Sequence, residues 1–573
     1  MNSALEMLAR FLSLALSAAT LGGCATTAPD TTAVHLGVGA VSAADPRAEQ
    51  AGLVMLRAGG NATDAAIAVM LALTVVEPQS SGIGGGGFLV RGAADGAVTS
   101  YDGRETAPIG ATPDWFLRAD GTVPPFGESV KSGLSVGVPG NIALAAKAHS
   151  AHGKLPWAKL FEPAIALARE GFRINPRLRG SLESTKDRAA WTAAGRRLFF
   201  GAEGNPHPVG TLIVNEDLAR TFEAVADAGP DAFYEGARAA ELAAVVAAAT
   251  PRPGAMTVAD IGGYVAKERA PVCGTYRRHR ICGMGPPSSG GIAVIQILGQ
   301  LERFDLVALG AENPVTWHLF VESQRLAYAD RELFIGDSDF VPVPVAGLID
   351  PGYLAQRGAL IAPDRRMASV APGKPAGTVT AFADGDEGPE SGTSHFSVVD
   401  REGTMVSYTS TIESAFGSGL VANGFYLNNE LTDFSRSPNV AGRPVANRVE
   451  GGKRPRSSMA PMVVWDPAGR PLMVVGAAGG PTIPVQTARS IIGVIDFGLD
   501  AQAALAMPFV MAFGDSMMVE QGTWLELSAD RLRALGHTVT IRPASVKANA
   551  VLRRDGTWQS ARDPRIESQL DTP

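Results

Sequence analysis

Residues 391–434 constrain the fold of this chain more than any other stretch. Two runs of β-forming residues, 395–399 and 405–409, flank a short turn that begins at Asp400 and ends at Gly403. Such runs on either side of a Gly-containing turn predict a β-hairpin.

Thr393 precedes the first strand of this hairpin. If the first and last residues of the turn pair, Thr393 faces Ser410, with Thr411 one step further along the second strand. A Thr hydroxyl at that place can orient a nucleophile or relay its proton. The alternative is an ordinary hairpin whose Thr and Ser residues only favour β-structure.

The dipeptide Gly392-Thr393 predicts a point at which the chain cuts itself. A hydroxyl is a weak nucleophile without a base beside it, and one solution uses the α-amine of an N-terminal Thr as that base. This amine titrates near pH ~7.7–8.0 and accepts a proton at neutral pH. Thr393 has a free amine only if the bond after Gly392 breaks, and glycine leaves its carbonyl open to attack.

Length and composition exclude several classes of protein. With 573 residues, 46% of them hydrophobic, the chain can build an extensive core, and disorder of its bulk is excluded. A net charge of −7 without a Lys/Arg block argues against nucleic-acid binding. The eight histidines are scattered and no H-E-x-x-H motif occurs, so we expect neither a metal nor a cofactor.

The N-terminus is typical of an export signal. Arg10 precedes an apolar run, residues 11–16, that is too short to span a bilayer, and Leu-Gly-Gly-Cys ending at Cys24 resembles a lipobox. We expect a lipoprotein-type signal peptide over residues 1–23, lipidation of Cys24 and a tether over residues 24–33. The protein is then periplasmic and bound to the membrane only through its lipid anchor. A plain secretory signal cleaved near Cys24 is the alternative.

Cys273 and Cys282 flank a predicted hairpin turn. A disulfide across an exported hairpin is feasible and stable in an oxidising compartment. Two unpaired thiols are the alternative.

Two glycine motifs suggest other enzymes. Gly82, Gly84 and Gly87 satisfy G-x-G-x-x-G, but they lie between a predicted helix and a predicted strand, the reverse of a dinucleotide fold. A close backbone approach explains them better. Residues 133–137 fit the G-x-S-x-G of serine hydrolases, but the Pro-rich segment before them is not a buried strand.

Hydrophobic periodicity and capping residues predict helices on both sides of Thr393. The expected helices are residues 46–58, 64–73, 142–150, 157–170, 218–228, 237–249, 315–333 and 483–497. A second hairpin is expected at residues 462–475, and residues 373–390 are expected to be an exposed linker before the cut. This pattern predicts two sheets between helical layers.

Several blocks of the sequence resemble the gamma-glutamyltranspeptidase family. Residues 393–400 are similar to the start of its small chain, and residues 427–434 are similar to its next block. Further similar segments, in the family's order, are residues 59–66, 84–88, 138–140 and 286–291. The resemblance implies the α/β class and the four-layer αββα N-terminal-nucleophile (Ntn) fold. It also implies a large chain of residues 34–392 and a small chain of residues 393–573.

The resemblance implies roles for individual residues. It makes Thr393 the nucleophile of self-cleavage and of acyl transfer, with Thr411 as the supporting hydroxyl. Gly479 and Gly480 match the oxyanion hole, where two N–H groups at a Gly-rich strand end meet little steric hindrance. His395, a strand residue, is expected to be structural.

A γ-glutamyl group carries an α-carboxylate and an α-ammonium, so its pocket needs a cation and carboxylates. By resemblance, Arg104 binds the carboxylate, assisted by Ser457 and Ser458. Glu430 and Asp433 match the pair that binds the ammonium.

The chain departs from the family's pattern at two places. Glu413 replaces the usual Asn near the substrate, which predicts stronger ammonium binding or a different acyl group. Residues 435–452, where many members carry a lid, form a shorter segment without an aromatic residue, which predicts a more open pocket.

The activity that the resemblance implies is that of a self-processing γ-glutamyltransferase and glutathione hydrolase. It would pass a γ-glutamyl group from a small-molecule donor, with glutathione expected, to water or an amino acid. Two alternatives are a related acylase that cleaves glutaryl or cephalosporin side chains, and a lipid-anchored binding protein that remains one intact chain.

Overall fold

The computed structural model describes residues 33–35, 37–379, 382–383, 385, 392–567 and 569–570. Outside these residues lie the predicted signal peptide, the predicted tether with Cys24 but without its last residue Ala33, and part of the predicted linker. Within the described part of the chain, no helix is long and apolar enough to cross a membrane.

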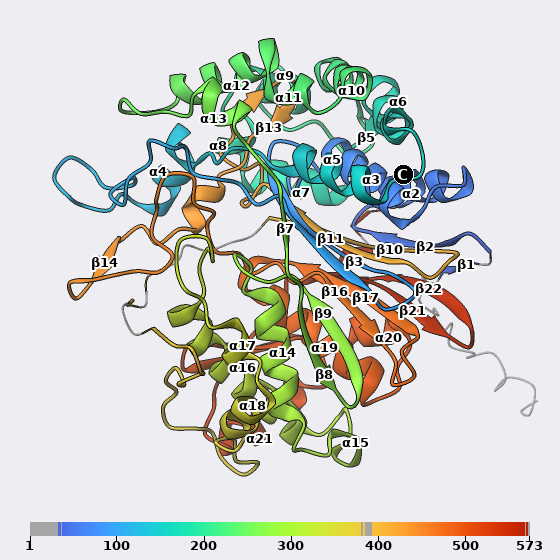
Figure 1. The fold of residues 1–573 in the computed structure, drawn as a ribbon, viewed down its shortest axis with the longest axis vertical. Coiled ribbons are helices and arrows are strands. Elements are labelled where there is room, and N and C mark those ends of the chain that lie inside the picture. The colour runs from blue at the N-terminus through green and yellow to red at the C-terminus, as the bar shows by residue number, and fades with distance from the viewer. Residues whose placement is uncertain are drawn as a thin grey trace, which may run out of the picture. The chain divides into compact units, whose positions relative to one another are not determined.

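Two antiparallel sheets lie at the centre of the molecule (Figure 1). The first has the strand order β2 (Gly39–Ala43), β10 (Ser394–Asp400), β11 (Met405–Thr411), β3 (Gly86–Gly92), β4 (Val98–Asp102) and β7 (Lys267–Arg269). The second has the order β1 (Ala33–His35), β22 (Thr557–Arg562), β21 (Lys547–Arg554), β17 (Pro471–Ala478), β16 (Met462–Trp465), β9 (His279–Gly283) and β8 (Val272–Tyr276). Each sheet combines strands from both sides of Thr393.

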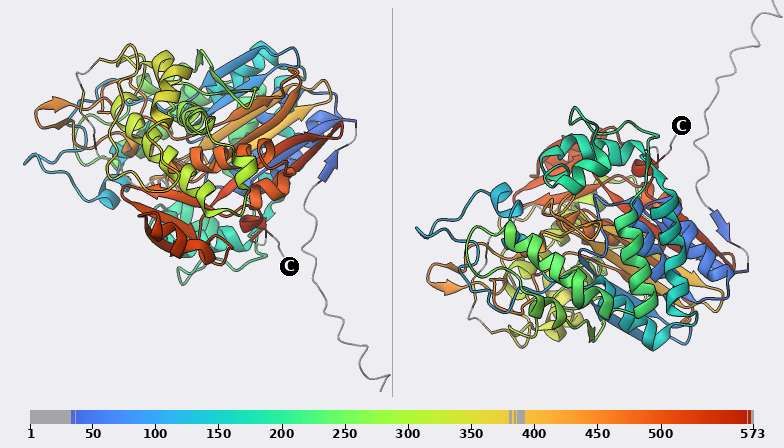
Figure 2. Two further views of the ribbon diagram at one scale, coloured as in Figure 1. Left: turned by 90° about the horizontal axis from the view of Figure 1, so that it is seen from below. Right: turned by 90° about the horizontal axis from the view of Figure 1, so that it is seen from above.

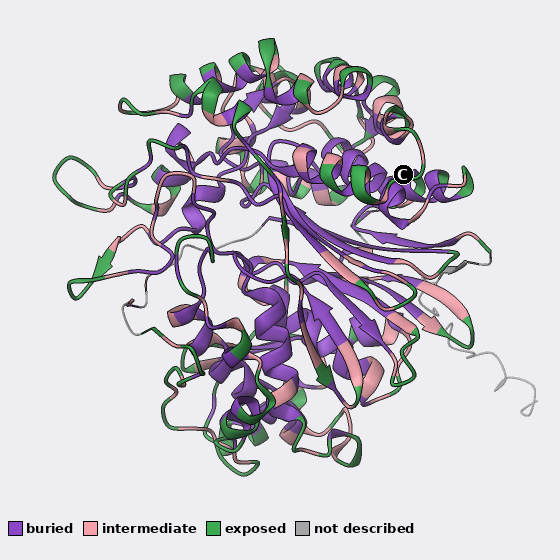
Figure 3. Ribbon diagram, viewed as in Figure 1, coloured by how far each residue is buried: buried purple, intermediate pink, exposed green. Residues whose placement is uncertain are grey.

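Apolar side chains hold the two sheets face to face. Phe88 and Val90 of the first sheet share one buried cluster with Val464 and Val475 of the second. The strands are buried along most of their length, whereas exposed residues lie on the outer surfaces of the helices (Figure 3). The core between the sheets therefore fixes β10, and with it Thr393, relative to β17 and β21.

Helices cover the outer face of each sheet, as both views of Figure 2 show. The layer on the first sheet contains α2 (Pro46–Arg57), α3 (Ala62–Val76), α5 (Asn141–His152), α6 (Glu162–Glu170) and α10 (Glu216–Ala228). The layer on the second contains α14 (Gly290–Leu301), α16 (Pro314–Phe334), α19 (Ile483–Ile495) and α20 (Ala501–Ala506). The layer order is the predicted αββα.

Further elements complete the two outer layers. They include α4 (Phe126–Val130), α7 (Pro176–Ser184), α9 (Ala193–Phe199), α11 (Asp231–Tyr234), α12 (Gly236–Ala248), α13 (Val258–Gly262), α18 (Pro351–Gly358), α21 (Ala529–Ala534), α22 (Pro564–Glu567), β18 (Val510–Phe513), β19 (Ser516–Glu520) and β20 (Thr538–Arg542).

Every residue of helix α3 is buried, as its nearly continuous apolar sequence predicts. It lies between the first sheet and the helices α5 and α6. The side chain of Asn61 caps it by accepting hydrogen bonds from the N–H groups of Thr63 and Asp64. The helix ends at Val76, and the charged residue Glu77 is its C-cap.

The hairpin of β10 and β11 forms, but its predicted register is wrong by one residue. Asp400 donates its N–H to the carbonyl of Thr404, not Gly403, and Ser394 pairs with Ser410. The loop has three residues because Gly403 adopts φ +85°, the left-handed conformation that ends such a loop. Thr411, rather than Ser410, is therefore the neighbour of Thr393.

The glycines before β3 are sites of close packing, as predicted. A Cβ on Gly84 would lie 2.0 Å from the carbonyl oxygen of Tyr426, and one on Gly85 would lie 2.0 Å from that of Thr411. Ser135 of the G-x-S-x-G motif ends a short 3₁₀ helix, and its buried hydroxyl donates to the carbonyl of Val130 at 2.8 Å. It is not on the strand-to-helix elbow that a serine hydrolase requires.

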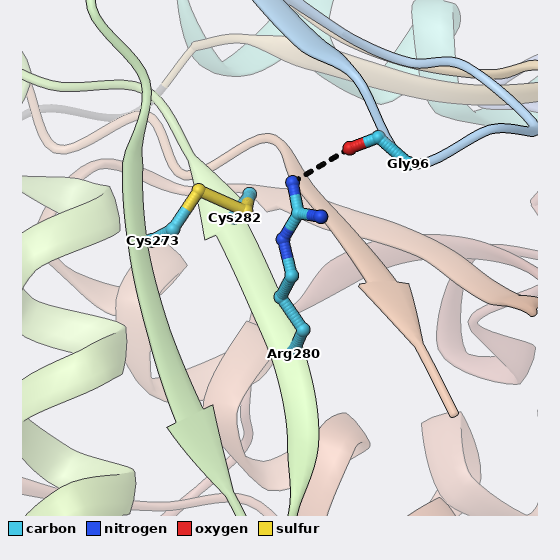
Figure 4. Close-up of a disulfide and its surroundings, with 4 residues drawn as sticks. All are labelled: Gly96, Cys273, Arg280 and Cys282. Carbon is cyan, nitrogen blue, oxygen red and sulfur yellow. Dashed lines mark hydrogen bonds between the residues drawn. A yellow bond between two sulfur atoms is a disulfide. The ribbon is translucent and has the colours of Figure 1, made fainter. Parts of the chain in front are cut away.

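Cys273 and Cys282 are directly opposite each other on β8 and β9 and form a disulfide (Figure 4). Arg280, on the same strand as Cys282, donates a hydrogen bond to the carbonyl of Gly96 at 2.8 Å. The second sheet is thereby tied to the β3–β4 turn of the first.

Candidate active site

Thr393 lies directly before β10, buried and with a backbone φ of +98°. Positive φ strains a β-branched residue by about 1–3 kcal/mol. Its hydroxyl donates to Oγ1 of Thr411 at 3.0 Å, and its N–H donates to the carbonyl of Ser80 at 2.9 Å. The predicted nucleophile is thus strained and hydrogen-bonded to a second hydroxyl.

The residue before Thr393 has no room for a side chain. A Cβ on Gly392 would lie 1.8 Å from the carbonyl oxygen of Glu413. The N–H of Glu413 donates to Oγ1 of Thr411 at 2.8 Å, with Glu413 itself at φ +72°. One tight turn therefore packs against Gly392 and orients the supporting hydroxyl.

Gly479 and Gly480 follow β17 and precede α19, with φ of +121° and +56°. Within the described part of the chain, neither N–H donates to another residue. Gly479 and Thr393 line the same cavity, which has a volume of about 200 Å³. Backbone N–H groups near the N-terminus of a 13-residue helix are suited to bind an oxyanion.

Arg104 follows β4 and is almost completely buried. Its guanidinium contacts the carboxylates of Glu430 and Asp433, and it also donates to the carbonyls of Pro455 at 3.2 Å and Arg456 at 2.8 Å. The predicted carboxylate-binding cation and the predicted ammonium-binding pair are therefore in direct contact.

Ser457 and Ser458 are buried beside this cluster and already engaged. The hydroxyl of Ser457 accepts from the N–H of Met459 at 3.2 Å, and that of Ser458 accepts from Arg331 at 2.9 Å. The segment that carries them reaches Arg104 through its backbone carbonyls.

Two further carboxyls lie near: Oε2 of Glu105 is 4.0 Å from the Arg104 guanidinium, and the carboxyl of Glu413 interacts electrostatically with Asp433 and Glu430. We call Arg104, Glu105, Glu413, Glu430 and Asp433 the acidic cluster. Burial raises the pKa of Glu105 to about 7 and, together with the charge of Asp433, raises that of Glu413 to about 8. Burial also holds the pKa of Glu430 well above its usual range, although Arg104 opposes the shift. Four carboxyls grouped with one cation can accept another cation.

His395 is the second residue of β10, but its side chain contacts neither Thr393 nor the acidic cluster. Its ring lies within hydrogen-bond distance of the hydroxyls of Thr409 and Ser397, at 2.9 and 3.1 Å. Burial lowers its pKa to about 3, so it stays neutral. Among the described residues, no group of His, Cys, Asp and Glu side chains could hold a metal ion.

A family model described as Gamma-glutamyltranspeptidase matches residues 48–571. The chain belongs to this family. It is 36% identical to the glutathione hydrolase proenzyme of Bacillus subtilis, over 92% of this chain and 90% of that protein. The glutathione hydrolase proenzyme of Escherichia coli is also 36% identical, over 93% of this chain and 91% of that protein.

Solved structures of the family's relatives share the fold. The cephalosporin acylase from Bacillus halodurans superposes with a TM-score of 0.80 at 26% identity, over 92% of this chain and 94% of that chain. A chain of the gamma-glutamyltranspeptidase of Helicobacter pylori gives a TM-score of 0.57 at 37% identity, over 59% of this chain and 96% of that chain. The predicted Ntn-hydrolase fold is confirmed.

On another side of Thr393 lies a second group of charges that sequence reasoning missed, and we call Glu77, Arg177 and Lys547 the basic cluster. Arg177 contacts Glu77, and Nζ of Lys547 lies 2.8 Å from Oε2 of the same carboxylate. In the sequence, Glu77 and Lys547 are single charges that border apolar segments. That is the one local signal that could have marked them, because their pairing is tertiary.

Residues 435–452, the segment predicted to be a short lid, contain a small exposed hairpin, β14 (Asn439–Val440) and β15 (Arg443–Pro444), seen at the left of Figure 1. Its return strand is followed by Asn447, whose side chain donates to the carbonyl of Asp433 at 2.7 Å. The segment is thus attached to the acidic cluster at its base.

Proposed function

We propose that the protein is an exported γ-glutamyl hydrolase and transferase that activates itself by cutting Gly392–Thr393, with glutathione as its donor. The observation that carries this proposal is the strained, hydroxyl-paired Thr393 in a chain whose acidic cluster gathers the predicted ligands of a γ-glutamyl group. Membership of the family and the glutathione hydrolase names of its relatives support the donor.

Self-cleavage needs only groups of this chain and water. Oγ1 of Thr393 attacks the carbonyl carbon of Gly392, the C–N bond breaks, and the hydroxyl proton passes to the new α-amine. Water then hydrolyses the ester, leaving a large chain ending at Gly392 and a small chain beginning at Thr393. Breaking the bond also releases the strain of the positive φ.

Turnover follows the same chemistry on a substrate amide. The α-amine of Thr393 takes the proton of its own hydroxyl as Oγ1 attacks, and Thr411 holds that hydroxyl in place. The oxyanion binds the N–H groups of Gly479 and Gly480, and the leaving amine receives the proton. Water or an amino acid then resolves the γ-glutamyl ester.

Charge selects the acyl group in this proposal. The α-carboxylate of the donor binds Arg104, and its α-ammonium takes the guanidinium's place between Glu430 and Asp433. Glu413 adds a carboxyl on the same side, which the family's Asn would not supply. A donor that lacks the ammonium leaves these carboxyls without a new counter-charge.

Export and anchoring belong to the same proposal. The signal-like residues 1–23 and the lipobox cysteine Cys24 support delivery to the periplasm and attachment through a lipid. The Cys273–Cys282 disulfide suits that oxidising compartment.

An acylase is the second candidate, because the cephalosporin acylase superposes over most of this chain and an Acylase ACY 1 proenzyme of a Pseudomonas species is 34% identical over 90% of it. Hydrolysis of γ-glutamyl and glutaryl anilides, which differ only in the α-ammonium, separates the two. We expect a preference for the γ-glutamyl anilide of about 100-fold or more in kcat/KM. A preference for the glutaryl anilide would reject the proposed donor and favour the acylase.

A further inference from the structure

Lys547, the first residue of β21, reaches the backbone of the nucleophile from the second sheet. Its Nζ donates to the carbonyl oxygen of Thr393 at 3.0 Å and to the hydroxyl of Ser394 at 3.2 Å. The carboxylate of Glu77 lies 2.8 Å away and accepts a second hydrogen bond, from the hydroxyl of Ser394, at 2.5 Å. The lysine, the carboxylate and the two residues at the start of β10 form one closed, buried network.

We propose that Lys547, held by Glu77, is a positioning residue that fixes Thr393 through its carbonyl and keeps its α-amine in the basic form after self-cleavage. The inference rests on the proposed function, in which Thr393 becomes the N-terminus of the small chain.

Cleavage turns Thr393 from an internal residue into a chain end, and chain ends are poorly ordered unless they are held. Three contacts hold this residue: its carbonyl to Lys547, its nitrogen to the carbonyl of Ser80, and its hydroxyl to Thr411. They come from three different elements, so together they fix the orientation of Oγ1. Removing one allows the nucleophile to move, and a displacement of about 1 Å can cost about 100-fold in rate.

The same ammonium acts on the amine through its charge. The carbonyl oxygen and the nitrogen of Thr393 belong to one residue, so Lys547 lies within a few ångströms of both. A nearby cation disfavours protonation of an amine and lowers its pKa. Burial lowers the pKa of Lys547 itself well below its usual range, and the charge of Arg177 adds to that shift, whereas Asp45 opposes it. The carboxylate of Glu77, 2.8 Å from Nζ, favours the charged form of Lys547.

The other charged groups around Thr393 do not cancel the effect of Lys547 on the pKa of the α-amine. Arg177 contacts Glu77, and Arg565 lines the cavity of Thr393 but is bound to Glu520 and Asp563. Asp45 acts on Lys547 from a greater distance and is itself paired with Arg47. On the opposite side, the backbone carbonyl of Glu413 faces Gly392. Burial raises the pKa of the Glu413 side chain to about 8, so its carboxyl is largely protonated at neutral pH.

The test compares Lys547→Met with a matched buried lysine. Lys453 is also fully buried, with its Nζ bonded to the carbonyl of Ala446 at 2.8 Å and to Glu450 at 3.0 Å, but it contacts no part of Thr393. Both variants lose a buried ammonium, so both report the cost of that loss to folding. The readouts are kcat, KM and the acidic limb of the kcat/KM profile on a γ-glutamyl anilide.

For Lys547→Met we expect kcat to fall about 100-fold with KM changed less than about threefold. We also expect the acidic limb of kcat/KM to move to higher pH by about one unit, because the α-amine becomes more basic. Lys547→Arg should return the limb to its wild-type position, and Lys453→Met should leave it unmoved. An unmoved limb in Lys547→Met, a limb moved to lower pH, or an equal shift in Lys453→Met would overturn the proposal.

If Lys547→Met does not fold or self-cleave, Lys547→Gln replaces it, because the Gln amide keeps a donor while losing the charge. The expected shift of the limb is the same, and its absence again rejects the role of the charge. Wild-type enzyme assayed in parallel separates the two proposals: failure of wild type to turn over γ-glutamyl anilide rejects the proposed function, whereas normal wild-type turnover with an unmoved limb rejects only the role of Lys547.

Discussion

Two buried charge clusters adjoin Thr393, and their charges are balanced differently. The acidic cluster gathers three carboxyls around the guanidinium of Arg104 and a fourth, Glu413, next to Asp433, whereas in the basic cluster Glu77 is shared by two cations. Burying unpaired charge is costly in both places. The acidic cluster therefore has capacity for an incoming ammonium, while the basic cluster directs its surplus donors to the backbone of Thr393. One cluster is suited to bind a substrate and the other to hold the nucleophile.

The largest effect should come from removing the cation of the acidic cluster. Arg104→Met removes the cation that binds the donor's α-carboxylate in the proposed function, and truncating one partner of a buried charge pair typically costs about 2–5 kcal/mol of binding. We expect kcat/KM for γ-glutamyl anilide to fall by about 100-fold to 3,000-fold, measured by steady-state kinetics. Arg357→Met, which removes a buried Arg bonded to Asp330 in the other helical layer, is the control and should leave KM unchanged. Equal losses in both variants would mean that Arg104 serves only the fold.

The register of β10 and β11 predicts different roles for two neighbouring hydroxyls of β11. Thr411→Ala removes the partner of the Thr393 hydroxyl and should lower kcat by about 10-fold to 100-fold. Ser410→Ala removes a hydroxyl that is bonded to Asn141 instead and should lower kcat less than about threefold. If Ser410→Ala has the larger effect, the register of β10 and β11 that we describe is not the functional one.

The pH dependence of stability at Glu413 shows whether the acidic cluster has too little positive charge to keep this carboxyl ionised. Its carboxyl has a pKa of about 8 when folded and near 4.5 when unfolded, so the unfolded state releases its proton first as pH rises. Wild type should therefore lose stability between about pH 4.5 and pH 8 relative to Glu413→Gln, by about 2 kcal/mol or more. Thermal midpoints of the two proteins at pH 4, 6 and 8 measure this. A difference that stays constant with pH would show that Glu413 is ionised throughout.

The smallest effect on activity is expected outside both clusters. Replacing Cys273 and Cys282 by Ser removes a short-range cross-link between β8 and β9, at a cost of about 2–3 kcal/mol of stability. We expect kcat and KM within about twofold of wild type, because neither cysteine contacts Thr393 or its clusters. A large loss of activity would place the disulfide among the determinants of the site.

Local sequence predicted much of the acidic side of the site and none of the basic side. Thr393, Arg104, Glu430 and Asp433 each lie in a block with its own pattern, so resemblance located them one by one. Glu77 and Lys547 are 470 residues apart and meet only because β21 packs beside the end of α3 and the start of β10. A pairing of that kind follows from the tertiary fold, which no local pattern specifies.

The prediction of the hairpin register was wrong for a different reason. The turn residues were identified, but the conformation of Gly403 decides whether the loop has two or three residues, and glycine accepts either. That single choice moves Thr411 next to Thr393. The αββα layers were predictable because helix caps and apolar runs are local, whereas the partners of each strand are not.

The central claim is that Thr393 becomes a chain end by self-cleavage and is then the nucleophile. Intact-mass measurement with N-terminal sequencing, on wild type and Thr393→Ala purified in parallel, tests it most directly. We predict that wild type yields two chains, the smaller beginning Thr-Ser-His at Thr393, and that Thr393→Ala remains one uncut chain without γ-glutamyl hydrolysis. A wild-type protein that hydrolyses the substrate while remaining uncut would contradict the account.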